Sequence, residues 1–478
     1  MKAQISALAL ALVAAGGCMS LPVRDPTTPN MATWSVADDQ EGQVVLDWWT
    51  GFNDPALDRL VERALSRNAD LRAADANLRA TQALAGESLA ARGPGGQVGA
   101  GLTRTRVAGL SQPPVPGTPE RLSTQTLANV GVGLSWELDL FGGLAANLDM
   151  ARAQADEARW MRRQVEAGVA AALVRAWAEY RYASALEERI QRRVDVQQQI
   201  LDSLETAETL GGVSRYDTEA ARAALDQARA ELPAVGAAQR NAARRIAVLS
   251  GDAPGTTLAD GRLPQVPTTL AAGDPAGMLR RRPDVAAAER QFAAAAAQAR
   301  VAVADLYPRI SLAGNVNLTA DPDRLGDAGA TGFSVGPSLT WGLFDMPRLR
   351  QRVVAADARS EAALARWEGT TLAALEEADG ALDVWQSRRE AARLALSAMD
   401  ASDSRRDLVV VRESAGQASR LARLQAEADA LSVQINALQA QSDELQAWIS
   451  AQLALGAGWR DVDTVAPTSG STSYRRRL

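Results

Sequence analysis

Few side chains in this sequence are suited to metal binding or acid–base chemistry. Histidine is absent, and Cys18 is the only cysteine among the 478 residues. The common ligands of zinc, copper and haem are therefore missing, as is the most frequent general base of enzymes. Carboxylates remain, but they do not gather into a site along the sequence. We predict no metal and no cofactor, which leaves the thiol of Cys18 as the side chain to account for.

The segment before Cys18 has the features of a secretory signal. Lys2 gives it a positive start, and an apolar run over residues 5–15 follows. This run is too short to cross a bilayer as a helix but has the length of a signal-peptide core. We therefore predict that residues 1–17 are a signal peptide that is removed on export.

The residues around Cys18 resemble the lipobox of bacterial lipoproteins, in which the cysteine is acylated and becomes the mature N-terminus. Small residues occupy positions 15–17, although Ala15 stands where such lipoproteins usually carry leucine. Met19 follows in place of aspartate, which in lipoproteins implies export to the outer membrane, where the acyl chains would be a firm anchor. The alternative is ordinary cleavage nearby, which would remove Cys18 or leave it as a free thiol.

The charge of the chain argues against a nucleic-acid partner. Acidic residues number 57 and basic residues 51, for a formal net charge of -6. No basic stripe is interleaved with aromatic residues, as a nucleic-acid surface would require. Without a histidine to act as the general base, a hydrolase is disfavoured, and we predict that the chain is not an enzyme.

Two stretches alternate strictly between apolar residues and small or polar ones, over residues 130–140 and 333–343. Each has about the 11 residues that a tilted transmembrane strand needs. A second candidate strand precedes each of them, at residues 97–107 and 309–318, and the connections are rich in proline, glycine and aspartate. Each half of the chain is thus predicted to carry one hairpin, whose connection we interpret as an extracellular loop.

The two halves also share a fixed spacing, which indicates an internal duplication. Three pairs of landmarks are each 205 positions apart, namely Trp136 and Trp341, Ser214 and Ser419, and Gly251 and Gly456. The predicted organisation is a signal peptide (1–17), a lipidated N-terminal linker (18–50), a first repeat (51–255), a connection (256–270), a second repeat (271–460) and a C-terminal tail (461–478).

A very long helix is predicted in each repeat. Between residue 141 and Gly211 there is no proline, and alanine, arginine, glutamate and glutamine dominate. Roughly 65 residues would form a helix of about 100 Å. Residues 348–413 offer the equivalent helix in the second repeat. Apolar residues at steps of three and four along parts of the first helix favour packing against neighbouring helices.

Periodicity alone leaves a second architecture open, namely a periplasmic coiled-coil scaffold with ordinary sandwich strands. Topology disfavours it. Four strands cannot close a barrel, and an open sheet edge is not tolerated in lipid. Spanning strands in this chain would therefore require several copies that contribute to one barrel, which predicts a homo-oligomer.

Several motifs resemble the NodT-type lipoproteins of the TolC-like outer-membrane efflux family. The likeness extends from about Trp48 to Trp459 and combines motif blocks from both repeats with the duplication. The motifs that carry it are DWWTGFNDP at residues 47–55, RRPDV at 281–285, YPRISL at 307–312 and WGLFD at 341–345.

The resemblance implies a mainly helical protomer with a strand part. Three protomers would form a 12-stranded outer-membrane β-barrel continuous with a 12-helix periplasmic α-barrel. The homotrimer would be a passive exit duct for small toxic compounds, driven by an inner-membrane transporter of the resistance-nodulation-division (RND) type through a periplasmic adaptor. Outer-membrane lipid would be its other partner.

In that family the turns between paired long helices form a periplasmic tip that docks the adaptor and closes the duct at rest. The glycines in these turns permit tight reversals, although they are equally expected at ordinary helix ends. The residues that the resemblance assigns to docking are Gly211, Gly212, Ser214 and Arg215 in the first repeat and Gly416, Ser419 and Arg420 in the second.

The gate is assigned to neighbouring positions. Asp217 stands where related channels place an aspartate that ties tip helices together, although a solvated surface acid is an alternative. Gln425 occupies the position where many relatives carry an acidic ring, which makes a gate of Leu421 and Leu424 possible. The main rival interpretation is a periplasmic adaptor or scaffold lipoprotein, but an adaptor would show a single helical hairpin rather than a duplicated unit.

Overall fold

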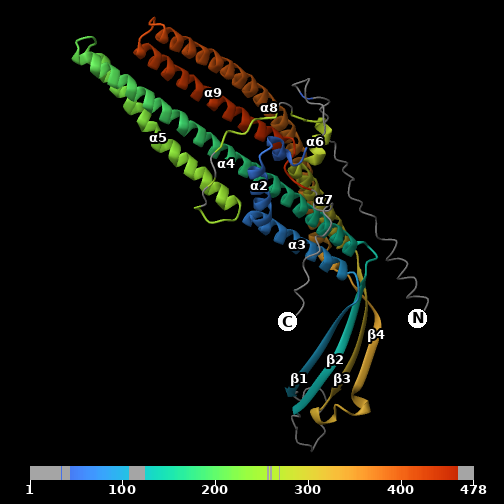
Figure 1. The fold of residues 1–478 in the computed structure, drawn as a ribbon. Helices are drawn as coiled ribbons and strands as arrows, with labels where there is room; N and C mark the ends of the chain where they lie inside the picture. Colours follow the sequence, from blue (N-terminus) through green and yellow to red (C-terminus); the bar gives the residue numbers. More distant parts are fainter. Residues whose placement is uncertain are drawn as a thin grey trace, which may run out of the picture. The chain divides into compact units, whose positions relative to one another are not determined.

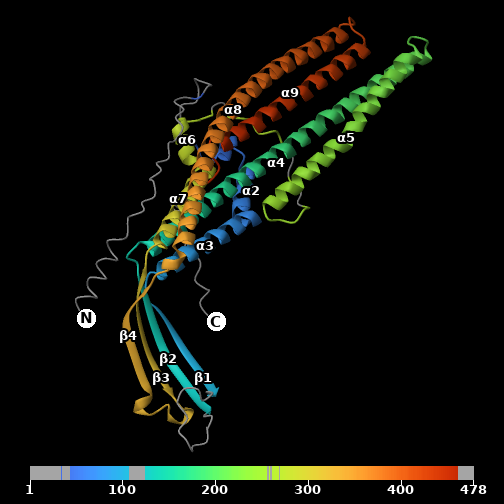
Figure 2. The same cartoon turned by 180° about the vertical axis from the view of Figure 1, so that it is seen from behind.

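The computed structural model describes residues 34, 44–106, 124–255, 258, 261–267 and 270–460, and Figures 1 and 2 show it from opposite sides. Long helices and one sheet dominate this part of the chain. The helices of four or more turns are α3 (Ala69–Ala90), α4 (Gly143–Thr209), α5 (Arg215–Leu249), α7 (Pro283–Ala304), α8 (Met346–Ser414) and α9 (Arg420–Ala454). The shorter elements are η1 (Trp48–Phe52), α2 (Pro55–Arg67), α6 (Pro275–Arg281), η2 (Pro322–Arg324), η3 (Ala328–Ala330) and η4 (Leu343–Asp345).

The described residues fall into two compact units. The sheet unit contains residues 79–157 and 289–366, and the helical unit contains residues 44–78, 158–288 and 367–460, both with the gaps given above. None of the described helices combines the length and the apolar character needed to cross a membrane.

The sheet unit is built around four antiparallel strands in the linear order β1-β2-β3-β4. The two predicted hairpins are present, and β2 pairs with β3 to join them into one sheet. The strand bounds are Gly95–Arg106 for β1, Thr124–Leu138 for β2, Arg309–Ala320 for β3 and Thr331–Thr340 for β4. Because the order is linear, β1 and β4 each leave one edge without a partner within the described chain.

The helical unit contains two long hairpins. In Figures 1 and 2, α4 lies beside α5 and α8 lies beside α9. Gln239 donates to the Ser184 hydroxyl at 2.8 Å in the first hairpin, and Gln434 donates to Asp403 at 2.8 Å in the second. The two predicted long helices are thus present as α4, with 67 residues, and α8, with 69, each about 100 Å long.

The core of the helical unit explains the motif at residues 47–55. The indole rings of Trp48 and Trp448 are both buried and meet edge to face, with centroids 5.5 Å apart. Asp54 caps α2 by accepting from the amides of Ala56 and Leu57, and its other oxygen accepts from the Trp177 indole at 3.0 Å. The motif therefore packs residues 48–55 against α4 and α9.

Candidate functional site at the hairpin tips and on the sheet

The first hairpin reverses through a glycine in the left-handed region. Gly211 has φ +73°, its amide donates to the Glu208 carbonyl at 2.9 Å, and the amide of Gly212 donates to the Ala207 carbonyl at 2.8 Å. This pair of bonds is a Schellman motif, which satisfies the last carbonyls of α4. A Cβ added at Gly211 would meet no atom within 4 Å. The need for glycine there is conformational rather than steric.

The second hairpin repeats this geometry. Gly416 has φ +71°, its amide donates to the Glu413 carbonyl at 2.9 Å, and that of Gln417 donates to the Arg412 carbonyl at 2.8 Å. A Cβ at Gly416 would also meet open space. The two tips are therefore alike in backbone, as the spacing of 205 residues led us to expect.

The tips differ in the caps that begin the returning helices. Ser214 and Asp217 form a complete capping box at the start of α5, with Ser214 Oγ 2.7 Å from the carboxylate. Ser419 caps α9 through the Ala422 amide at 3.1 Å, but Ala422 has no carboxylate to return a bond. Asp217 is thus engaged within its own helix start in the single chain.

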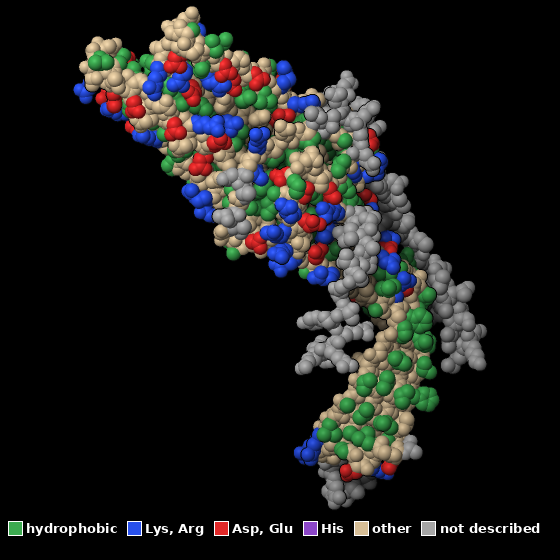
Figure 3. Space-filling model, in the orientation of Figure 1, with side chains coloured by type: hydrophobic (Ala, Val, Ile, Leu, Met, Phe, Trp, Pro, Cys, Tyr) green, Lys and Arg blue, Asp and Glu red, His purple; other side chains and the backbone are tan. Residues whose placement is uncertain are grey.

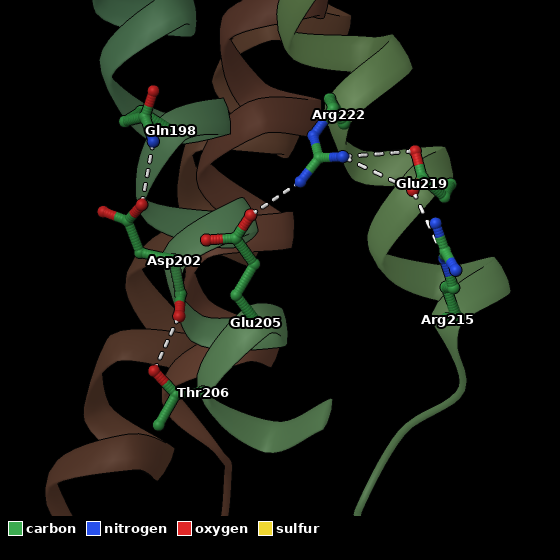
Figure 4. A network of polar contacts seen from close by, with 7 residues as sticks. All are labelled: Gln198, Asp202, Glu205, Thr206, Arg215, Glu219 and Arg222. Carbon is green, nitrogen blue, oxygen red and sulfur yellow. Dashed lines mark hydrogen bonds and ion pairs between the residues drawn. The ribbon is translucent and has the colours of Figure 1, made fainter. Parts of the chain in front are cut away.

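One ion pair joins the two helices of the first tip, and two further pairs lie within α5 (Figure 4). Arg222 on α5 lies 3.0 Å from Glu205 on α4 and 3.3 Å from Glu219 on its own helix. Arg215, whose side chain is 83 % exposed, lies 3.6 Å from Glu219. In the second tip, Arg423 on α9 bridges to Glu413 on α8 at 2.9 Å. The side chain of Arg420 is exposed to solvent.

The two leucines assigned to the gate have different surroundings. Leu424 is fully buried, in a cluster that also contains Leu201, Leu204 and Leu225. A side chain buried inside the protomer cannot face the bore, so we correct its role to packing between α9 and the first hairpin. Leu421 is partly buried at the margin of the same cluster and remains the gate candidate of the pair.

The sheet has two chemically distinct faces. Strand register places Val98, Val132, Val316 and Phe333 side by side on one face, and alternation carries the pattern along each strand. This apolar face consists of Val98, Ala100, Leu102, Ala128, Val130, Val132, Leu134, Trp136, Leu138, Ile310, Leu312, Val316, Leu318, Phe333, Val335, Pro337 and Leu339, with glycines between them. Figure 3 shows hydrophobic side chains gathered along the sheet.

The opposite face is mostly polar, with glycines and, in β2, Leu127 among its residues. In β2 it carries Asn129, Gly131, Gly133 and Ser135, and in β3 it carries Ser311, Asn315, Asn317 and Thr319. Most of the large apolar side chains on the other face are well exposed in the single chain, with Val98 at 78 % and Phe333 at 81 %. An exposed apolar band backed by a polar face is the pattern of a strand that separates lipid from an aqueous lumen.

Aromatic side chains mark the end of the sheet next to the helices. The indole of Trp136 donates to the Arg92 carbonyl at 2.9 Å, and that of Trp341 donates to the Leu306 carbonyl at 3.0 Å. Phe141 stacks on Tyr307 with the centroids 4.8 Å apart. Rings of this kind with one polar contact suit the boundary between hydrocarbon and water.

The comparison with known proteins decides the family. The outer membrane efflux protein profile matches residues 60–252 and 276–457. The chain belongs to this family. It is 28% identical to the outer membrane protein OprJ of Pseudomonas aeruginosa, over 98% of each chain, and 27% identical to nodulation protein T of Rhizobium leguminosarum bv. trifolii, over 87% of this chain and 89% of that one.

The fold agrees with the family. The solved outer-membrane channel OprN superposes with a TM-score of 0.81 at 32% identity, covering 91% of this chain and 99% of that one. The chain is therefore an outer-membrane channel component of an efflux system, with the TolC-like fold. This confirms the predicted fold and function, and the alternative of a periplasmic adaptor is not supported.

The ion pairs at the tips of this efflux protein were not predicted from its sequence. These pairs are Arg222 with Glu205 and Arg423 with Glu413. The sequence offered a signal for them, because the two residues of each pair are about equally far along the chain from the tight turn between their helices. No group of histidine, cysteine or carboxylate side chains that would hold a metal occurs in the described ranges. Cys18 lies outside the described residues, so its acylation stays a prediction.

Proposed function

We propose that three copies of this chain assemble into one closed exit duct. The observation that carries the proposal is the sheet, which has an apolar face, a polar face and two unpartnered edges at β1 and β4. Unpaired backbone groups at an edge are not tolerated in hydrocarbon, and four strands cannot close on themselves. Edge pairing between copies satisfies both edges and encloses the polar face as a lumen.

The helical part would close in the same way. Each protomer contributes two long helical hairpins, α4 with α5 and α8 with α9. Three protomers would therefore contribute twelve helices to a periplasmic barrel. The duct would be passive. It would carry small toxic compounds outward, and an inner-membrane transporter of the RND type would supply the energy through a periplasmic adaptor.

The tips are the proposed docking and gating surface. Six turns in a trimer, three with Gly211, Gly212, Ser214 and Arg215 and three with Gly416, Ser419 and Arg420, would form one ring at a common depth. Equal helix lengths support this, since α5 and α9 both contain 35 residues. Leu421 and Asp217 are the proposed gate residues. Acyl chains on Cys18 would hold each protomer to the outer membrane.

Conductance in planar bilayers and molar mass in mild detergent test the duct. We expect a stable pore and a trimer mass by light scattering. A monomer, or a trimer that does not conduct, would contradict the proposal. Cross-linking needs carboxylate or engineered-cysteine chemistry, because Lys2 is the only lysine and would leave with the signal peptide.

A further inference from the structure

Two arginines interrupt the apolar face at the end of β1. Register sets Arg104 opposite Thr126 and Arg106 opposite Thr124, so all four side chains lie on the face of Val98 and Leu102. These four residues, called the rim cluster, offer two guanidinium groups and two hydroxyls. Both arginines are exposed. Figure 3 shows basic side chains at this end of the sheet, beside the apolar surface.

The distance of the rim cluster from Trp136 along the membrane normal follows from the number of strand residues between them. Trp136 and Thr126 lie on the same face of β2, ten positions apart. Ten residues of strand span about 33 Å, which at a tilt of about 40° corresponds to about 25 Å along the membrane normal. This is the height of the apolar band of an outer-membrane strand. With Trp136 at one boundary of the hydrocarbon, Arg104 lies at the other, and Arg106 lies slightly farther out.

The arginines of the rim cluster have no partner among the residues that the structure describes. Within the described chain, neither guanidinium forms an ion pair or a side-chain hydrogen bond. Arg324, in the β3–β4 connection, lies 3.2 Å from Asp327 and is thereby compensated. A guanidinium that borders hydrocarbon is stabilised where it reaches an anionic headgroup, and its planar fork of donors matches phosphate oxygens.

We propose that the rim cluster binds the phosphate groups of a phosphorylated lipid in the outer leaflet. Arg104 and Arg106 supply the charge, and the hydroxyls of Thr124 and Thr126 donate further hydrogen bonds to the same oxygens. The proposal rests on the proposed function, in which the sheet lies in the outer membrane and the rim cluster faces the outer leaflet.

The test is lipid binding by the purified trimer in detergent, measured by native mass spectrometry. The probes are an acylated disaccharide lipid with two phosphate monoesters, its dephosphorylated form and inorganic phosphate. The wild-type chain should prefer the phosphorylated lipid to the dephosphorylated one by about tenfold, which corresponds to one or two charge-assisted hydrogen bonds. Inorganic phosphate should compete only weakly, because it lacks the acyl chains.

Three variants make the result specific. The double variant Arg104→Ala with Arg106→Ala should lose the preference, whereas Arg104→Lys with Arg106→Lys should keep part of it. Arg324→Ala removes an arginine of the neighbouring connection and should change nothing. Equal binding of both lipids by the wild-type chain, or an undiminished preference in the double alanine variant, would overturn the proposal. Bilayer conductance of that variant separates the two ideas, since a normal pore without lipid preference leaves the duct intact.

Discussion

Arg282 donates a hydrogen bond of 2.9 Å from Nη1 to the carbonyl oxygen of Ala454, the last residue of α9. The first repeat has the same junction with a different side chain, because Asn68 donates to the carbonyl of Leu249 at 3.1 Å and Leu249 ends α5. Both donors follow a short helix and precede a longer one. In each repeat, a side chain between two helices thus satisfies the end of the returning long helix.

Replacing Arg282 with alanine should destabilise the helical unit by about 3 kcal/mol, the low end for breaking a buried charged pair. The Arg282 side chain is buried. It donates a hydrogen bond of 2.6 Å to Glu377 and two hydrogen bonds of 2.7 and 3.0 Å to Asp284. Thermal unfolding of the trimer followed by circular dichroism would measure the loss. As a control, Arg393→Ala removes an exposed pair with Glu390 and should leave the midpoint where it is.

The same site predicts a pH dependence. Burial pushes the pKa of Asp284 upward, but the hydrogen bonds and charge of Arg282 outweigh it, so the pKa lies below the usual 3.8. Folding is therefore favoured by the ionised form above pH 3.8, and this contribution is lost as the pH falls from there through the folded-state pKa. Unfolding midpoints measured at about pH 5 and about pH 3 should fall less in Asp284→Asn than in the wild-type chain. Equal slopes would contradict this.

Valine at Gly211 or Gly416 should cost about 1–2 kcal/mol of local stability through the positive φ alone, since open space surrounds both positions. We expect reduced efflux in a dye-accumulation assay with a normal yield of trimer. Asparagine tolerates the left-handed region, so Gly211→Asn should keep most of the activity. Normal efflux by the valine variants would remove the tips from the docking surface.

Serine substitutions should separate Leu421 from Leu424. Leu424→Ser places a hydroxyl in a buried cluster and should lower tip stability by about 3 kcal/mol. Leu421→Ser, at a partly buried position, should raise the resting conductance in planar bilayers with little change in the unfolding midpoint. If Leu421→Ser conducts like the wild-type chain, Leu421 does not belong to the gate.

Acylation of Cys18 is tested by metabolic labelling with radioactive palmitate. Cys18→Ser should abolish the label, because serine offers no thiol for the thioether link. Equal labelling of the variant and the wild-type chain would show that the lipid is attached elsewhere. Cys18 is the only cysteine, so no second thiol complicates the comparison.

The sequence by itself determined the local elements and their repetition. Strict alternation over residues 130–140 and 333–343 fixed two strands, because side chains of a strand point to opposite faces in turn. The absence of proline between residue 141 and Gly211 fixed a helix of great length, and Gly211 fixed its end. These features depend on neighbours along the chain, and motif resemblance extended them to the family.

Only the tertiary structure decided which side chains face a neighbour and which face outward. The sequence offered no reason to distinguish Leu421 from Leu424. In the structure, Leu421 lies at the margin of a hydrophobic cluster and Leu424 lies inside it. The structure also shows that Asp217, which stays a proposed gate residue, closes a capping box with Ser214. The pairing of Arg104 with Thr126 assigned Arg104 to the rim cluster. Burial, pairing and register arise from segments far apart in the chain, so the sequence pattern alone did not contain them.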